Sequence, residues 1–277
     1  MTLSTAPTQL KMGWTMQRPA ELTTTPLTVP HQPTVSVVIP ALNEEKNLVY
    51  VLSRIPGWVH EVLLVDGHST DETVTVARRL YPAIRIVMQE GRGKGAALRS
   101  GFRAATGDII VMLDADGSTA PEEIATFIAP LLTGADFVKG SRFMQGGGTV
   151  DMTLFRYLGH WLLLMLVRLT FGGHYSDLCY GYNAFWARVL PRLNLDADGF
   201  EIETLMNVRA LRRGLKVAEV PSFEAPRIFG TSHLRTIPDG WRVLKTILKE
   251  RFTDPHGMTR AVLQHNFSRA VTASEAQ

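Results

Sequence analysis

The sequence predicts an α/β fold in which a doubly wound, mostly parallel β-sheet is flanked by helices. Three observations indicate this fold. Short apolar runs alternate with segments of helical spacing through the first half of the chain. Several of these runs are apolar throughout, as expected for strands that helices cover on both faces. Polar residues follow the runs directly, at the carboxyl ends where ligands gather in open α/β sheets.

The expected elements alternate regularly in the first half of the chain. Strands are expected over 35–40, 61–66, 84–88, 108–113 and 135–139, and helices over 44–55, 94–105 and 121–132. A further helix follows the second strand, and the spacing of Ser69 and Glu72 predicts a capping box at its start. This alternation implies parallel strands joined by right-handed crossovers.

The second half of the chain is less regular. Glycines at 146–148 predict a flexible loop, and 153–171 predicts a long apolar helix. Later elements are expected to be a strand over 180–186, a helix over 201–213, a strand over 217–220 and a basic amphipathic helix over 237–252. The chain is therefore expected to comprise a disordered leader (1–34), one domain (35–252, with halves 35–140 and 141–252) and a flexible tail (253–277).

Composition limits the class of protein. The 277 residues are 45% hydrophobic and 20% charged, which is typical of a globular domain, and the formal net charge is +3. The pI of about 9.1 is too mild to indicate a nucleic-acid partner, but it suits phosphate-bearing ligands or an anionic membrane surface. Cys179, as the single cysteine, excludes an internal disulfide, indicates a reducing cytosol and is expected to be a small buried filler.

The most informative stretch is 109–116, where an apolar run ends in Asp114 and Asp116. Two carboxylates so close together repel each other unless a cation lies between them. A hard divalent ion that also binds a substrate phosphate would provide that cation. An acidic turn that caps a helix is the alternative, since aspartate is common in both places.

Two other loops follow predicted strands and are expected to meet this acidic pair in one crevice. Glu44 in the first loop and Asp66 in the second can accept hydrogen bonds from a base or a ribose. Residues 91–95 open a helix with glycines and cations, and this pattern suits contact with a phosphate group. Asn43 and Ser69 are equally consistent with simple helix caps. The first strand leads into neither a Rossmann glycine fingerprint nor a Walker A loop.

Taken together, these segments resemble a family 2 glycosyltransferase of the GT-A fold, over about 35–252. The resemblance is carried by segments 37–45, 65–71, 93–98 and 114–116. Segments similar to the polyprenyl-phosphate (dolichyl-phosphate mannose synthase-like) branch are 140–143, 199–203 and 227–232. The resemblance implies a nucleotide-diphosphate sugar donor, Mg²⁺ or Mn²⁺ as cofactor, and a C-terminal extension that binds the acceptor, a lipid phosphate.

The resemblance also assigns roles to individual residues. It places the metal and the pyrophosphate on Asp114 and Asp116. The substrate-binding residues that it implies, together with the reading of the loops above, are Pro40, Ala41, Asn43, Glu44, Asp66, Gly93, Lys94, Asp114, Arg142, Arg156 and Arg227. The candidate catalytic residues are Asp116, Arg142 and Glu201. Two positions depart from the branch, which often has glutamine where Ser118 stands and lysine where His233 stands.

The chemistry of the acceptor distinguishes two possible reactions. A hydroxyl acceptor must lose a proton and needs a positioned carboxylate base, whereas a phosphate monoester is already largely ionised and needs cations to hold it. Arg142, Arg156 and Arg227 favour a phosphate acceptor, although a solvated basic face is the alternative. Glu201 and Glu203 keep a hydroxyl acceptor open, although acids are also common at helix starts.

The apolar helix expected over 153–171 suggests contact with lipid. Its most apolar part, 161–167, is too short to cross a bilayer. A helix lying in the membrane interface and a buried core helix are both consistent with the pattern. We expect a cytoplasmic, peripheral inverting glycosyltransferase that uses a polyprenyl phosphate. The alternatives are a glycosyltransferase acting on a soluble hydroxyl acceptor and a non-catalytic nucleotide-binding scaffold.

Overall fold

The computed structural model describes residues 32–150, 152–231 and 234–253. The leader expected over 1–34 and the tail expected over 253–277 lie almost entirely outside the described residues, as does His233.

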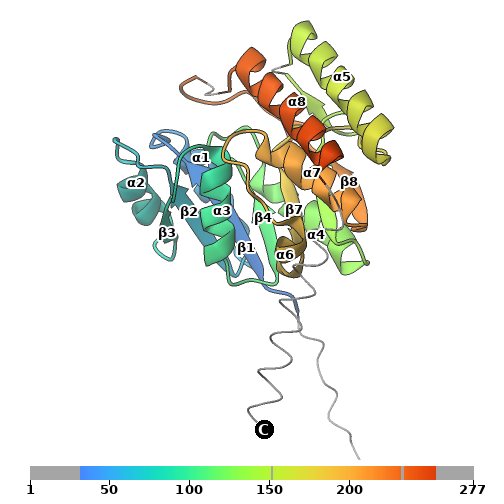
Figure 1. Ribbon diagram of the computed structural model, residues 1–277. Coiled ribbons are helices and arrows are strands. Elements are labelled where there is room, and N and C mark those ends of the chain that lie inside the picture. The colour runs from blue at the N-terminus through green and yellow to red at the C-terminus, as the bar shows by residue number, and fades with distance from the viewer. Residues whose placement is uncertain (1–31, 151, 232–233, 254–277) are drawn as a thin grey trace, which may run out of the picture. The chain divides into compact units, whose positions relative to one another are not determined.

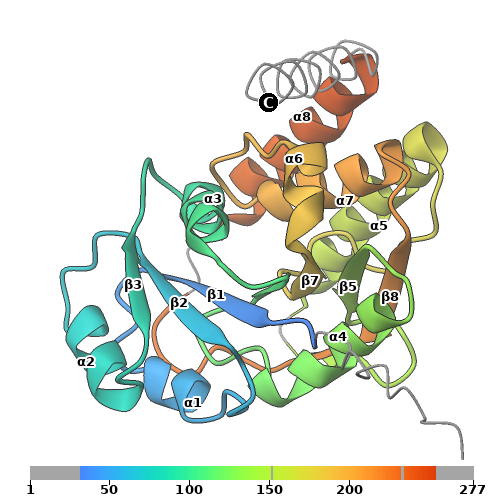
Figure 2. The same cartoon turned by 90° about the horizontal axis from the view of Figure 1, so that it is seen from below.

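A seven-stranded sheet forms the centre of the fold (Figures 1 and 2). Its strands, in spatial order, are β3 (Arg85–Met88), β2 (Glu61–Asp66), β1 (Val35–Ala41), β4 (Ile109–Met112), β7 (Asn183–Trp186), β5 (Phe137–Ser141) and β8 (Val217–Pro221). All neighbours pair in parallel except β7, which is antiparallel to both β4 and β5. The predicted doubly wound, mostly parallel sheet is confirmed.

The helices cover both faces of this sheet. They are α1 (Leu48–Leu52), α2 (Thr73–Leu80), α3 (Lys94–Ala104), α4 (Ile124–Leu132), α5 (Leu154–Phe171), α6 (Leu190–Leu193), α7 (Ile202–Arg212) and α8 (Thr236–Phe252), with short 3₁₀ turns at Pro121–Glu123 and Ala187–Val189. Alternate residues of β1 separate two cores: Val37 packs with α1 and α4, whereas Val38 packs with α3 and α7. Because the sheet is apolar on both faces, its strands have the uninterrupted apolar sequences from which the fold was predicted.

A third layer lies outside α7. Helices α5 and α8 pack against each other and against α7 (Figure 1), around a small core that includes Leu164, Val208 and Ile247. The predicted loop at 146–148 contains one short strand, β6 (Gly148–Thr149), which pairs in parallel with β9 (Phe223–Glu224). This two-stranded sheet brings residue 224 close to the end of β5.

The predicted helix over 44–55 and the predicted capping box were both wrong in detail. Helix α1 begins only at Leu48, because the loop before it is bonded to the next loop of the sheet edge. The Asn43 N–H donates to Ser69 Oγ at 2.9 Å, and the Glu44 N–H donates to Thr73 Oγ1 at 2.8 Å. Ser69 therefore joins two loops and does not cap α2, which starts at Thr73.

Close packing of α3 on the sheet gives a direct test of the core. A Cβ added to Gly101 would lie 2.4 Å from Val38 Cγ1 and 2.7 Å from Val65 Cγ2. We expect Gly101→Ala to lower the free energy of unfolding by about 1–3 kcal/mol, because overpacking must move α3 away from β1 and β2. Urea unfolding measures this change. Gly57→Ala is the matched control, since a Cβ at Gly57 meets nothing within 4 Å. Equal effects of both variants would contradict the packing described here.

Candidate active site

A cavity of about 1260 Å³ extends from the carboxyl ends of the central strands to the gap between α5 and α8. Ten of the residues predicted from the sequence line it: Pro40, Ala41, Glu44, Gly93, Lys94, Asp114, Asp116, Arg142, Arg156 and Arg227. Asn43, Asp66 and Glu201 are not among the lining residues. The crossovers of the sheet therefore bring most of the predicted site together, from segments almost 190 residues apart.

Asn43 and Asp66 hold the loops that form one end of the cavity. The Ser69 N–H donates to Asp66 Oδ2 at 3.1 Å, and the Asp66 side chain is buried. Asn43 has a φ of 56°, and its Oδ1 accepts a hydrogen bond from the Thr70 N–H at 2.8 Å. These side chains shape the crevice from behind its surface.

The glycine segment at the start of α3 was predicted to contact a phosphate group, but it contacts another loop of the chain instead. The N–H groups of Gly95 and Ala96, at the start of α3, both donate to the backbone oxygen of Asp198, at 2.8 and 3.2 Å. A Cβ on Gly93 would lie only 2.4 Å from the same oxygen. The glycines thus permit close approach of the chain's own 197–199 loop, and these N–H groups are not available to a ligand.

Lys94 lies between two carboxylates. Its Nζ is 2.7 Å from Asp114 Oδ1 and 2.9 Å from Glu203 Oε1. Burial would lower the pKa of Lys94, but the two carboxylates outweigh burial and raise it above its ordinary value. Burial raises the pKa of Glu203, although Lys94 opposes that rise. Lys94 therefore remains protonated and joins α3 to the end of β4 and to α7.

Asp116 is held by its own turn and by a distant arginine. Its Oδ1 accepts hydrogen bonds from the Ser118 N–H at 3.0 Å and the Ser118 hydroxyl at 2.6 Å. Arg227 Nη1 is 3.4 Å from Asp116 Oδ2, while Arg227 Nη2 is 2.6 Å from Glu44 Oε1. Lys94 and Arg227 thus supply the positive charge that the sequence argument assigned to a metal ion.

The donor set nevertheless fits a magnesium or manganese ion. Asp114 Oδ2 accepts no hydrogen bond from the described residues, and Asp116 Oδ2 has only the 3.4 Å contact with Arg227. Carboxylate oxygens are the preferred ligands of such ions, which commonly use one or two carboxylates together with substrate phosphates and water. Within the described ranges no group of three His, Cys, Asp or Glu side chains forms a complete protein cage. An ion held by Asp114 and Asp116 would therefore need oxygens from a substrate or from water to complete its ligand shell.

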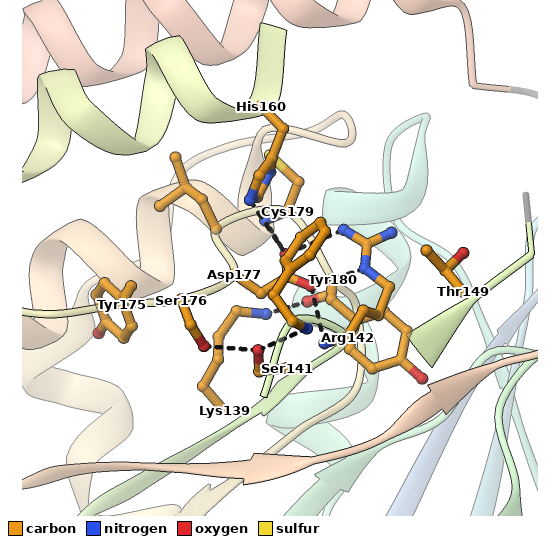
Figure 3. Close-up of polar contacts among 12 residues, drawn as sticks. Lys139, Ser141, Arg142, Thr149, His160, Tyr175, Ser176, Asp177, Cys179 and Tyr180 are labelled. Carbon is orange, nitrogen blue, oxygen red and sulfur yellow. Dashed lines mark hydrogen bonds and ion pairs between the residues drawn. The ribbon is translucent and has the colours of Figure 1, made fainter. Parts of the chain in front are cut away.

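Arg142 lines the cavity but is largely buried in an ion-pair cluster (Figure 3). Its Nε and Nη2 bond to the two oxygens of Asp177 at 2.7 and 3.0 Å, and its Nη1 bonds to Glu224 Oε2 at 2.9 Å. Burial would raise the pKa of Asp177, but Arg142 outweighs burial and holds it below its ordinary value. Because two carboxylates already occupy its guanidinium, Arg142 is placed to orient Glu224 more directly than to grip an acceptor.

The exposure of Cys179 and the hydrogen bonding of His160 both differ from what is usual for these residue types. Cys179 is exposed in the cavity wall and is not a buried filler. Desolvation of its thiol by the surrounding atoms, together with Asp177, raises the pKa of that thiol to about 11. His160 of α5 is buried against Phe143, with ring centroids 5.0 Å apart. Neither imidazole nitrogen has a hydrogen-bond partner among the described residues.

The sequence argument missed Glu224 and Asp239, which both line the cavity. Asp239 lies on α8, accepts a hydrogen bond from the Arg235 N–H at 2.7 Å and pairs with Arg242 at 3.1 Å. Glu224 stands three residues before Arg227, so its closeness in sequence to a predicted site residue was the available indication.

Comparison with known proteins agrees with this geometry. A family model described as "Glycosyl transferase family 2" matches residues 36–190. The undecaprenyl-phosphate mannosyltransferase of Micrococcus luteus is 32% identical over 212 residues, which cover 72% of this chain and 87% of that protein. The dolichol-phosphate mannosyltransferase of Pyrococcus furiosus is 33% identical over 210 residues, which cover 73% of this chain and 59% of that protein.

A solved structure resembles the fold as well. It is the glucosyl-3-phosphoglycerate synthase of Mycobacterium tuberculosis, in complex with Mn²⁺, UDP-glucose and phosphoglyceric acid. The two chains superpose with a TM-score of 0.65 at 28% sequence identity, over 80% of this chain and 81% of that chain. The shared architecture is that of the GT-A fold.

The buried imidazole predicts a pH dependence of stability. Burial lowers the pKa of His160, so the unfolded chain binds this proton more readily than the folded protein does. The stability present above the ordinary histidine pKa of about 6.5 is therefore lost as the pH falls through and below that value. We expect the melting temperature of His160→Gln to fall less than that of the wild type on acidification, as scanning calorimetry would record. His174, an exposed histidine, gives the control His174→Gln. An equal fall in all three proteins would contradict the assignment.

Proposed function

This chain belongs to glycosyl transferase family 2, and on that premise we propose that it transfers a sugar from a nucleotide-diphosphate sugar to a polyprenyl phosphate, with inversion of configuration. The two mannosyltransferase relatives, whose names specify undecaprenyl-phosphate and dolichol-phosphate, support the lipid acceptor.

The observation that carries this proposal is the ion pairing of the carboxylates that line the cavity. In the part of the chain that the structure describes, each carboxylate that lines the cavity is ion-paired. The pairs are Glu44 and Asp116 with Arg227, Asp114 and Glu203 with Lys94, Glu224 with Arg142, and Asp239 with Arg242. A hydroxyl acceptor needs a carboxylate base to take its proton, and a neighbouring cation makes a carboxylate a weaker base. A phosphate monoester needs none, because it is already largely ionised at neutral pH.

The donor is assigned to the 35–140 half of the domain. Pro40, Ala41 and Glu44 line the end of the cavity where the nucleoside would lie. Asp114 and Asp116 would hold Mg²⁺ or Mn²⁺ beside the diphosphate. When bound, the ion would supply positive charge that offsets the charge developing on the leaving group.

The acceptor is assigned to the 141–252 half. Arg156 of α5 lines the cavity on the side away from β1 and is placed to hold the acceptor phosphate. An oxygen of that phosphate attacks the anomeric carbon from the face opposite the leaving diphosphate, and the bond from that carbon to the diphosphate oxygen breaks. The transition state has oxocarbenium character, and no protein group needs to remove a proton.

The second candidate function is transfer to a soluble hydroxyl acceptor. It is favoured by the solved relative, which was crystallised with phosphoglyceric acid. Of the two acids that the sequence kept open for this role, Glu203 lines the cavity and has a pKa raised by burial, whereas Glu201 does not line the cavity. A non-catalytic scaffold is disfavoured by the two aspartates with available oxygens beside the cavity.

A peripheral position at the cytoplasmic face of a membrane forms part of the proposal. By length and composition α5 could cross a membrane, and only 17% of it is buried. The alternative expected from the sequence, a helix buried in the core, is therefore not supported for α5. On one face of α5, His160 is buried, and Arg168 Nη2 donates to the backbone oxygen of Tyr175 at 2.8 Å. On the other face, Leu162 and Leu169 are 70% and 81% exposed. An outward apolar face beside α8, which carries exposed Arg242 and Lys249, suits an anionic lipid surface.

The first test of this function is the transfer reaction itself. Purified protein is incubated with nucleotide sugars, Mg²⁺ or Mn²⁺ and polyprenyl phosphate, and release of nucleoside diphosphate is measured. We expect lipid-dependent release by the wild type and a loss of at least about a hundredfold in Asp116→Asn, because one metal ligand is weakened. Asp108→Asn, at the opposite end of β4, is the matched control and should retain activity.

Glu203→Gln separates the two acceptor classes in the same assay. Retained transfer to the lipid would exclude Glu203 as a base. Transfer to phosphoglyceric acid without lipid, abolished in Glu203→Gln, would replace the proposed acceptor with a soluble one. Undiminished turnover by Asp116→Asn would contradict the assigned metal site.

Membrane docking gives an independent prediction. Leu158 and Leu169 are exposed on α5 and do not line the cavity, so Leu158→Glu with Leu169→Glu alters only the outer face. We expect binding to phosphatidylglycerol-containing vesicles to weaken by more than about tenfold, since each buried leucine contributes roughly 1.5–3 kcal/mol. Vesicle sedimentation measures the change. Leu132→Glu, at an exposed leucine of α4, should leave binding unchanged.

A further inference from the structure

Glu224 has one oxygen fixed by the protein and one that is available to a ligand. Its Oε2 accepts hydrogen bonds from Arg142 Nη1 at 2.9 Å and from Thr149 Oγ1 at 2.7 Å. No residue in the described ranges bonds to its Oε1. The side chain is 23% exposed and lines the cavity. It is thus a rigid carboxylate that presents one acceptor atom to whatever fills the cavity.

The two supports of Glu224 are a buried arginine and a half-buried threonine. Arg142 is only 5% exposed and is held by both oxygens of Asp177, which is 0% exposed. Thr149 belongs to β6, and β6 pairs with the strand that carries Glu224. A carboxylate fixed from two directions loses little conformational entropy when a ligand binds, which is the property of a preorganised recognition group.

Glu224 lies close to the turn that carries Asp116. The next residue, Ala225, donates its N–H to the backbone oxygen of Ser118 at 2.8 Å. Glu224 also pairs with Arg142 and shares the lining of the cavity with Arg156 of α5, the residue proposed to hold the acceptor phosphate. In any transfer between a diphosphate and an acceptor, the sugar occupies the space between the two.

Resting on the proposed function, we propose that Glu224 recognises the donor sugar by accepting a hydrogen bond from one of its hydroxyl groups through Oε1, and that Arg142 and Thr149 act as positioning residues for it. Because Oε2 already accepts from a guanidinium, Glu224 is a recognition group and not a general base. A directional contact with one hydroxyl distinguishes sugars that differ only in the configuration at that carbon.

Calorimetric binding tests this inference with ligands that do and do not contain a sugar. The probes are UDP, UDP-glucose, UDP-galactose, GDP, GDP-mannose and GDP-glucose, each with Mg²⁺. In Glu224→Gln we expect affinity for the preferred nucleotide sugar to fall about ten- to a hundredfold, the range of a hydrogen bond to a charged group, with affinity for the matching nucleoside diphosphate unchanged. The preference between epimeric sugars should shrink by the same factor.

Two further variants control for structure. Glu123 accepts a hydrogen bond from Ser222, two residues before Glu224, but does not line the cavity. Glu123→Gln should therefore bind the nucleotide sugars as tightly as the wild type does. Glu224→Asp keeps the charge beside Arg142 and shortens the reach toward the sugar, so it should lose affinity in the same way. If Glu224→Gln binds no nucleoside diphosphate, the same affinities are compared for Glu224→Asp, and that comparison decides whether Glu224 recognises the sugar.

The outcomes separate this inference from the function on which it rests. A wild type that binds no nucleotide sugar would overturn both. Equal losses for nucleoside diphosphate and nucleotide sugar, or no loss for either, would overturn the role of Glu224 alone. Unchanged nucleotide-sugar affinity with lost turnover would also overturn it, and would assign Glu224 to proton transfer.

Discussion

Lys94 connects three elements of the fold beside the cavity. It comes from α3, in the first half, and bonds at once to Asp114 after β4 and to Glu203 on α7. A buried charge is costly unless it is paired, and removal of one partner leaves the others uncompensated. The cavity exists in its present form because this cation keeps Asp114, α3 and α7 at fixed distances.

The position of α7 in turn fixes the outer layer. Val208 of α7 packs with Leu164 of α5 and Ile247 of α8, so the apolar third layer is aligned with the sheet edge through one helix. The exposed apolar face of α5 adjoins the cavity, since Phe155 and Leu162 are exposed and also line it. Helix α7 thus positions both the surface suited to lipid and the site suited to a phosphate on a lipid.

Sequence periodicity was enough to predict the sheet, since β1, β2 and β4 are apolar on both faces and end in polar loops. The reading of the loops, together with the resemblance to a known family, predicted ten residues of the cavity lining. Neither source predicted how these polar groups pair with one another. Gly93 was expected near a phosphate, yet its close neighbour is Asp198, more than one hundred residues later. Arg142 was expected to face an acceptor, yet Asp177 and Glu224 hold it. Such pairings depend on tertiary distances that no local pattern contains.

The two cations differ in how closely they contact the acidic pair. Lys94 is 2.7 Å from Asp114 and 2.9 Å from Glu203 and has a raised pKa, so displacing it would expose both carboxylates. Arg227 is 3.4 Å from Asp116 and pairs more closely with Glu44, at 2.6 Å. Asp116 Oδ2 would therefore be the more readily available ligand for a divalent ion bound beside a diphosphate. The oxygen that Arg227 would release, Asp116 Oδ2, is the one that the Ser118 hydrogen bonds leave open, so the geometry of the turn already points the pair toward a shared ligand.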